Sequence, residues 1–335
     1  SFTDPEKGHK FMSVTWGGFI GAISGMNDAG LAVTINAAKS DYPLASATPV
    51  SIVTREILQY AGNIREAIAI AKSRKMFVSE SFLVASAADG KAVIIEKTPN
   101  DLDVYDPHKD YIICTNHFQS NVLSRSPKNQ EQLKESASPY RYERMQELLE
   151  ASGKNTVQKT VDILRDRKGL HGVSIGNGNE KAVNQLISHH SIVFEPQKLR
   201  VWVSTSPWQL GRYVCYDLNK VFALKGMKVN REIAEDSLGI APDPFLQTEE
   251  FRRFERFRKY KQALIDGQEV NADSLVVSNP DFYQAYVLAG DYLYRKKDFT
   301  KALRFYKKAL TREIATGYEE AHIRKQIRKI ESKQQ

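Results

Sequence analysis

Three polar residues lie at positions where their side chains could take part in chemistry. Asn36 ends the apolar run LAVTIN, Asn116 follows the apolar segment YIICT, and Arg141 lies in SPYRYERM. Side-chain amides and guanidinium groups are hydrogen-bond donors, so they could hold a developing oxyanion or a carboxylate. Each also has a structural explanation, because asparagines cap turns and arginines pair at surfaces. The three residues alone leave both roles open.

The other reactive residue types give weaker signals. His189 and His190 are adjacent, so on a strand they would point to opposite faces and could not chelate one metal. Cys114 and Cys215 lie in apolar segments typical of core thiols and are too few for a disulfide framework. GNGNE at 176–180 lacks the ending of a phosphate loop and predicts an ordinary loop. We therefore expect no metal and no cofactor.

The elements that must position these residues fall into two regions, and the first runs to about Leu224. Strand-like apolar segments there alternate with amphipathic helices. Strands are predicted at Phe11–Trp16, Phe19–Ser24, Leu31–Asn36, Phe82–Ala87, Ala92–Glu96, Tyr111–Thr115, Ser191–Phe194, Val201–Ser204 and Tyr213–Tyr216, and helices at Ser51–Tyr60, Asn63–Ser73, Tyr140–Leu149 and Val157–Arg165. Hairpin groups separated by helical pairs indicate an α+β fold with antiparallel sheets.

From about Asn230 the pattern becomes helical. Small and aromatic residues in AYVLAGDYLYRKKDFTKALRFYKKAL recur at the spacing of a tetratricopeptide helix pair. These residues are Tyr286, Gly290, Phe299, Ala302, Tyr306 and Ala309. A single repeat cannot bury its face alone, so the helix Glu249–Ile265 and the last helix from Glu319 should pack on it. A plain helical hairpin is the alternative.

Three separated blocks, GMNDAGLAVTIN, ICTNHFQS and SPYRYERM, resemble in order those of a known enzyme class. This class is the N-terminal-nucleophile hydrolases of the choloylglycine hydrolase and acyl-coenzyme A:6-aminopenicillanic-acid acyltransferase type. WGGFIGAISGMN, HHSIVFEP and VWVSTSPWQLG share the resemblance, which looks closest to bacterial members and covers about the first two thirds of the chain. It implies a four-layer αββα sandwich over residues 1–224. The helical pattern described above predicts a separate tetratricopeptide-like domain over 230–335.

By this resemblance, Asn36 is an oxyanion donor, Asn116 holds the nucleophile region and the amine, and Arg141 orients the centre electrostatically. The implied reaction is hydrolysis of a linear amide, or acyl transfer, through an acyl-enzyme on a terminal nucleophile exposed by autoproteolysis. That nucleophile is usually a cysteine, and it should precede the Gly-Met-Asn turn by several dozen residues, with an Arg-Asn-x-Asp element between. We therefore expect the nucleophile to lie outside the given sequence. We also expect the chain as given to be inactive on its own. Ser1 is the weaker alternative nucleophile.

The resemblance implies a small-molecule N-acyl amide as substrate. Phe19, Ile20 and Tyr42 could line an acyl pocket, although a place in the core explains them equally well. The alternative function is that of a catalytically inactive homologue that binds a protein partner through its helical C-terminal repeat. A homo-oligomer is compatible with both functions.

Composition narrows the partners further. The chain has 335 residues and a net charge of +8, and no apolar run approaches the roughly 20 residues that span a bilayer. The basic excess lies mostly after Phe251, and Tyr294 with the three basic residues that follow is the best case for nucleic acid. No nucleic-acid motif accompanies it, so we expect a solvated helical face and no nucleic-acid partner. An exported, periplasmic or cytoplasmic location stays open, because a signal would lie before Ser1.

Overall fold

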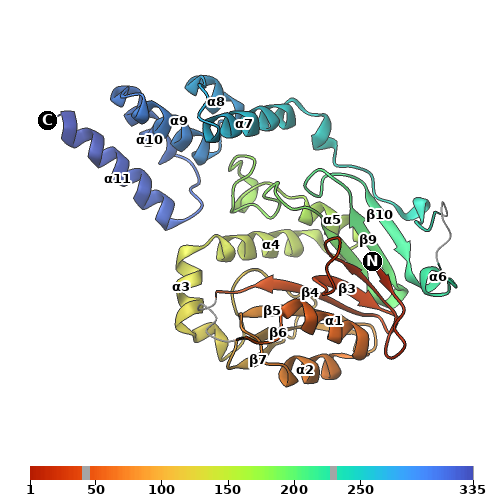
Figure 1. Cartoon of the computed structure of the whole chain (residues 1–335). Helices are drawn as coiled ribbons and strands as arrows, with labels where there is room; N and C mark the ends of the chain where they lie inside the picture. The colour runs from red at the N-terminus through yellow and green to blue at the C-terminus, as the bar shows by residue number, and fades with distance from the viewer. Residues whose placement is uncertain (40–45, 227–231, 335) are drawn as a thin grey trace.

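The computed structural model describes residues 1–39, 46–226 and 232–334 of the chain (Figure 1). Its largest feature is a seven-stranded sheet whose strands follow one another in chain order, each antiparallel to its neighbours. The strands are β1 (Phe2–Thr3), β2 (Phe11–Val14), β3 (Ser24–Asn27), β4 (Leu31–Ala37), β5 (Glu80–Ser86), β6 (Lys91–Lys97) and β7 (Leu102–Tyr105).

The hairpin of β3 and β4 is fixed to the first helix, α1 (Val50–Tyr60), by a buried asparagine. The side-chain amide of Asn27 donates to the carbonyl oxygens of Leu58 and Ala61, at 2.9 and 2.7 Å. Gly25 on β3 is needed because a Cβ there would lie 2.5 Å from the carbonyl oxygen of Met12. The asparagine and glycine of the Gly-Met-Asn turn are therefore explained by packing alone.

Two helices, α1 and α2 (Ile64–Ser73), cover one face of the large sheet (Figure 1). Val33 on β4 and Phe82 on β5 pack there against Ile57 of α1, in a core cluster that excludes water from this face. Burial of such side chains is the main stabilising contribution to a layer of this kind.

The opposite face of the large sheet packs on a second, three-stranded antiparallel sheet. Its strands are β8 (Ile192–Glu195), β9 (Arg200–Ser204) and β10 (Tyr213–Asp217). Met26 and Ala32 of the large sheet meet Val201 of β9 in the core between the sheets. Beyond the second sheet, Val161 of α5 (Val157–Leu164) packs on Trp202. These layers confirm the predicted α+β fold and four-layer αββα sandwich.

The remaining helices are α3 (Pro127–Glu135), α4 (Ser138–Ser152), α6 (Leu218–Phe222), α7 (Glu249–Ile265), α8 (Ala272–Ser278), α9 (Tyr283–Arg295), α10 (Phe299–Ala309) and α11 (Gly317–Gln334). Of these, α6 contributes Leu218 and Val221 to the core between the sheets, and α4 runs between the large sheet and the C-terminal helices in Figure 1. Among the described residues, no helix is both long and apolar enough to cross a membrane.

The C-terminal helices bury a core of their own that also takes in Leu186 and Leu210 from the sandwich side. Within it, α9 and α10 pair closely, because a Cβ at Gly290 would lie 2.8 Å from the ring of Tyr306. The small residue and the aromatic ring thus have the packing roles that their spacing predicts. The tetratricopeptide identity and the division at about residues 224–230 stay predictions.

Three local predictions are wrong. The strand predicted at Phe19–Ser24 begins only at Ser24, and Phe19 and Ile20 lie in an exposed loop. The strand predicted at Tyr111–Thr115 is an irregular segment that lies across the sheet without joining it. His189 and His190 also lie in a loop, so the argument from opposite strand faces does not apply to them.

Candidate active site

Asn36 belongs to a polar row that crosses three strands. The sheet register places Asn36 of β4 opposite Ser81 of β5, and Ser81 opposite Glu96 of β6. Val33 and Ile35 face the helices α1 and α2, so the alternation of a strand turns Asn36 to the other face. The row therefore lies on the inner side of the large sheet, away from the helical layer.

The segment 111–120 lies over this row and is anchored by Glu96. The Glu96 carboxylate accepts hydrogen bonds from the backbone amides of Gln119, at 2.6 Å, and Ser120, at 3.0 Å. Burial raises the pKa of Glu96, and these hydrogen bonds oppose the shift because they stabilise its anion. Asn36 reaches the same segment, and its Nδ2 lies 3.4 Å from the carbonyl oxygen of Cys114.

Asn116 and Arg141 are joined directly. A guanidinium nitrogen of Arg141 donates to Asn116 Oδ1 at 2.7 Å, and Asn116 Nδ2 donates to the carbonyl oxygen of Ala37 at 3.0 Å. Ala37 follows Asn36 on β4, so one line of contacts runs from the helix α4 to the end of that strand. Burial lowers the pKa of Arg141, which still remains a cation at neutral pH. The structure thus brings the three predicted residues together.

A buried cluster of two hydroxyl groups and one imidazole binds the backbone of Asn116. Ser138 Oγ accepts from the Asn116 backbone amide at 2.8 Å and donates to Thr115 Oγ1 at 3.0 Å. His117 Nδ1 lies 2.9 Å from the same Ser138 oxygen. Burial, with a smaller contribution from the Arg141 charge, lowers the pKa of His117 to about 4. The imidazole is therefore neutral at physiological pH and adds no second cation to the site.

Arg141 is held on its other side by the loop 176–181. Its second guanidinium nitrogen donates to the carbonyl oxygen of Glu180 at 2.8 Å. The C-terminal helices fix this loop in turn, since Asn279 bonds both the backbone amide and the carbonyl of Asn177, at 3.2 and 2.7 Å. Glu313 adds an ion pair of 2.5 Å with Lys181. The helical region therefore takes part in positioning Arg141.

Sequence patterns did not reveal Glu96, Ser138 or Glu180 as members of this site. Glu96 carried the clearest signal, because it is a lone carboxylate in the apolar strand AVIIEK and is fully buried. Ser138 lies in the same SPYRYERM block as Arg141 but reads as an ordinary helix start. Glu180 contributes a backbone carbonyl, which no residue type can indicate.

The other predicted residues lie apart from this cluster. Ser1 adjoins the edge strand β1, which is separated from β4 by β2 and β3, and its backbone pairs with Ser13 of β2. Phe19 and Ile20 are 39% and 72% exposed, and the carbonyl of Ile20 accepts a hydrogen bond from Arg55. Tyr42 lies outside the described residues.

Neither thiol is poised to act as a nucleophile. Burial raises the pKa of Cys114, and the nearby Glu96 carboxylate raises it further. Burial likewise raises the pKa of Cys215, to about 11. Both side chains therefore stay protonated at neutral pH, where a thiolate is the reactive form. In the described part of the chain, no group of three or more His, Cys, Asp or Glu could hold a metal ion.

The arrangement supplies donors and positive charge at a partly open position. Asn36 is half-buried, and within the described residues its one side-chain hydrogen bond is long, so its amide retains capacity for a ligand. Arg141 adds a desolvated cation nearby. Such a site can stabilise negative charge that develops on a carbonyl oxygen.

Several known proteins are similar to this chain. A curated uncharacterized protein from Archaeoglobus fulgidus is 32% identical over 89 residues, which span 26% of this chain and 14% of that relative. A variant of conjugated bile acid hydrolase from Clostridium perfringens shows 13% identity and a TM-score of 0.38, over 63% of this chain and 78% of the other. An N-acylethanolamine-hydrolyzing acid amidase ortholog from Caenorhabditis elegans shows 18% identity and a TM-score of 0.34, over 50% and 72%. Structural similarity at this level carries no argument about function.

The family comparison is decisive for membership. The family model described as acyl-coenzyme A:6-aminopenicillanic acid acyl-transferase matches residues 1–206, which include the polar row, Asn116, Arg141 and the loop 176–181. This range covers more than half of the chain. The protein therefore belongs to the acyl-coenzyme A:6-aminopenicillanic acid acyl-transferase family.

Proposed function

We propose that this protein is an enzyme that hydrolyses a linear amide bond, or transfers its acyl group, through an acyl-enzyme formed on an N-terminal nucleophile. The observation that carries the proposal is the convergence of Asn36, Asn116 and Arg141. They lie far apart in the sequence and are joined by the contacts around Ala37 and Cys114. Family membership supports the same reaction class.

In this proposal Asn36 donates to the oxyanion of the tetrahedral intermediate. Its amide needs little reorganisation, because the pairing of Asn36 with Ser81 of β5 fixes its backbone. One such donor typically contributes about 10²- to 10³-fold in rate. Arg141 acts at longer range, since a desolvated guanidinium stabilises nearby negative charge more strongly than one in water.

Asn116 has an orienting role. Its carbonyl oxygen is occupied by Arg141 and one amide hydrogen by Ala37, which leaves a second hydrogen for the amine of the nucleophile or of the substrate. The terminal α-amine serves as the base, because its pKa near 8 suits proton transfer at neutral pH. Cys114 and Cys215, whose pKa values are raised, are not assigned to this step.

The substrate proposed is a small-molecule N-acyl amide. An acyl-enzyme mechanism requires a carbonyl whose leaving amine can depart and be replaced by water or by another amine. Water gives hydrolysis and an amine gives acyl transfer, so the two outcomes share the same residues. No cofactor is required by any step.

The experiment that tests the proposal is N-terminal sequencing and intact mass of the mature protein made from its complete gene. We expect a mature chain that begins at a cysteine, serine or threonine exposed by self-cleavage. A mature chain that begins at any other residue would exclude an N-terminal nucleophile and overturn the proposal.

A further inference from the structure

A cavity of about 440 Å³ lies where the sandwich meets the C-terminal helices, and aromatic rings form much of its wall. Trp208 packs edge-on against Phe254, with ring centroids 5.7 Å apart. Phe254 stacks with Phe257 at 6.4 Å, and Phe257 meets Phe282 edge-on at 5.6 Å. The four rings make a continuous apolar surface contributed by a sandwich loop, α7 and the segment leading into α9.

The charged side chains that line this cavity are all of one sign. Arg258 and Lys261 of α7 line it, and no aspartate or glutamate does. The Arg258 guanidinium lies 4.4 Å above the Trp208 ring, and Lys261 Nζ donates to the neutral Gln284 at 3.0 Å. In the described part of the chain neither cation forms an ion pair with a carboxylate. Both retain donors for an anion.

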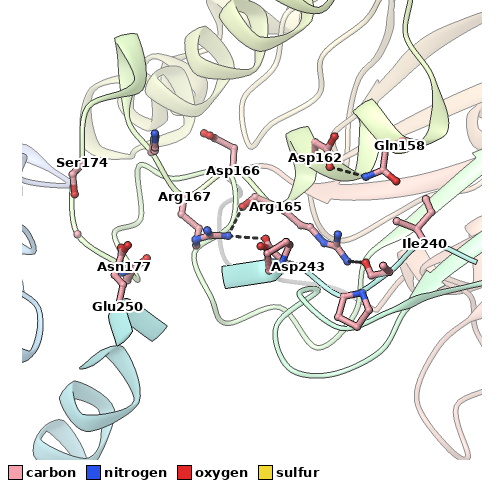
Figure 2. A pocket seen from close by; sticks show the side chains of 15 residues that line it. Gln158, Asp162, Arg165, Asp166, Arg167, Ser174, Asn177, Ile240, Asp243 and Glu250 are labelled. Atoms are coloured by element: carbon pink, nitrogen blue, oxygen red, sulfur yellow. Dashed lines mark hydrogen bonds and ion pairs between the residues drawn. The ribbon is translucent and has the colours of Figure 1, made fainter. Parts of the chain in front are cut away.

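A second, larger cavity of about 650 Å³ shows what a structural charge cluster looks like in this protein. Figure 2 shows Arg167 bonded to Asp243, at 2.9 Å, and to the carbonyl of Arg165, at 3.2 Å. Glu250 of that cavity accepts a hydrogen bond from the neutral Asn177, at 2.7 Å. Arg167 and Asp243 there form a cation–anion pair, whereas no aspartate or glutamate lines the aromatic cavity.

The aromatic cavity is tied to the candidate active site through one loop. Gly178 lines the cavity, and the carbonyl of Glu180, two residues later, accepts the hydrogen bond from Arg141. Lys261 also acts electrostatically on the Glu180 carboxylate. A ligand in the cavity would therefore lie against the loop that holds Arg141.

We propose that this cavity is a binding site for a small organic carboxylate with an aromatic or compact apolar body. The rings of Trp208, Phe254, Phe257 and Phe282 would bury the apolar body, and Arg258 and Lys261 would pair with the carboxylate. A cationic ligand would be repelled by Arg258 and Lys261, and a neutral one would not form a charge-assisted contact with either. The site stands independently of the proposed amide chemistry, because binding requires no nucleophile.

The test is isothermal titration calorimetry of the full chain with 3-phenylpropionate and its neutral analogue 3-phenylpropionamide. One charge-assisted contact corresponds to about tenfold in Kd, so we expect the carboxylate to bind at least about tenfold more tightly than the amide. The double variant Arg258→Gln with Lys261→Gln should lose that preference. The matched control, Arg256→Gln with Lys259→Gln, removes the same charge from exposed positions of α7 that do not line the cavity, and it should retain the preference.

Equal binding of the carboxylate and the amide would overturn the proposal. Equal loss in the two double variants would also overturn it, since it would show attraction to the net charge of α7 rather than a site. The proposed amide chemistry is tested separately by Asn36→Ala, which should leave the calorimetric binding unchanged.

Discussion

Two asparagines of one hairpin, Asn27 and Asn36, illustrate how position decides role. Asn27 is fully buried and uses its side chain to tie the turn to the end of α1. Asn36, at the far end of β4, is half-buried, and its side chain makes one long hydrogen bond to the part of the chain that the structure describes. The first side chain is used up by the fold, and the second retains donors for a substrate.

Replacing Asn36 by alanine should therefore separate activity from stability. In the complete enzyme, Asn36→Ala is expected to lower kcat by about 10²- to 10³-fold, because one oxyanion donor is lost. Its unfolding free energy should change by less than about 1 kcal/mol. Steady-state kinetics and urea unfolding check the two expectations.

Asn27→Ala is the informative contrast for that variant. It leaves several buried backbone groups without partners, so we expect a loss of about 3 kcal/mol in unfolding free energy. An Asn36→Ala enzyme with full kcat, or one as unstable as Asn27→Ala, would contradict the assignment of Asn36.

The imidazole of His117 reports on Arg141 without any substrate. Burial and the Arg141 charge lower the pKa of His117 to about 4. The neutral imidazole therefore contributes fully to the free energy of unfolding above its ordinary pKa, and this contribution is lost as the pH falls toward 4. Arg141→Met removes one cause, and we expect the His117 pKa to rise while staying below its ordinary value. An NMR titration of the imidazole measures this shift.

The exposed Arg125→Met serves as the control and should leave the His117 titration unchanged. An unchanged His117 pKa in Arg141→Met would show that the guanidinium does not reach this cluster. The line of contacts through Asn116 would then have no electrostatic consequence.

At the residue scale, sequence reasoning found the donors but not their supports. Asn36, Asn116 and Arg141 stand out because each is polar beside an apolar segment or within a block that resembles an enzyme family. The contacts that join them link positions 25 to 79 residues apart, and such pairings are not encoded in local spacing. Glu96 and the carbonyl of Glu180 bind residues that are distant in the sequence, and only the folded structure shows these contacts.

At the scale of elements, the loop 176–181 connects the helical region to the candidate active site. Asn279 at the end of α8 makes two hydrogen bonds to Asn177, and a Cβ at Gly176 would lie 2.4 Å from the backbone of Phe282. The loop thus has little freedom between the C-terminal helices and Arg141. The glycine-rich sequence serves close packing here, and no phosphate site is needed to explain it.

Loosening this loop should affect activity at a distance. Asn279→Ala is expected to lower the unfolding free energy by about 2 kcal/mol and to lower kcat more than it raises KM, because the Glu180 carbonyl no longer fixes Arg141. Asn271→Ala, which removes the N-cap of α8 without touching the loop, should lower stability by about 1 kcal/mol and leave kcat unchanged. Equal kcat values for the two variants would contradict a positioning role for Asn279.

The elements also show where periodicity misleads. YIICT is apolar like a buried strand, yet its backbone pairs with no strand of the sheet. The Gln119 side chain instead donates a hydrogen bond to the carbonyl oxygen of Ile113. Helices α1, α2, α4, α5 and α7 were predicted close to their observed bounds, because their apolar faces repeat over several turns. The short β1 and β7 lack enough residues to show any period.

At the scale of the whole molecule, one buried carboxylate should shape the dependence of stability on pH. Glu80 is 9% exposed, its Oε2 has no hydrogen-bond partner within the described residues, and burial raises its pKa to about 7. The folded state holds this proton more tightly than the unfolded state. Glu80 therefore contributes fully to the free energy of unfolding at pH values below the pKa that it has in the unfolded chain. This contribution is lost as the pH rises through about 7.

Glu80→Gln imitates the protonated form at every pH. Relative to the parent protein, we expect the variant to gain about 2 kcal/mol of unfolding free energy between about pH 5 and about pH 8. Urea unfolding across that range measures the difference, with the exposed Glu6→Gln as the control. Parallel pH profiles for Glu80→Gln and the parent protein would contradict a raised pKa at this position.

The central claim is that an acyl group is carried by the first residue of the mature chain, with Asn36 and Arg141 stabilising its formation. The most direct measurement is peptide mass spectrometry after acid quenching of the complete mature protein with 4-nitrophenyl hexanoate. We predict one hexanoyl group on the N-terminal residue, and little adduct in Asn36→Ala. A hexanoyl group on Cys114, on another internal side chain, or on no residue at all would contradict the account.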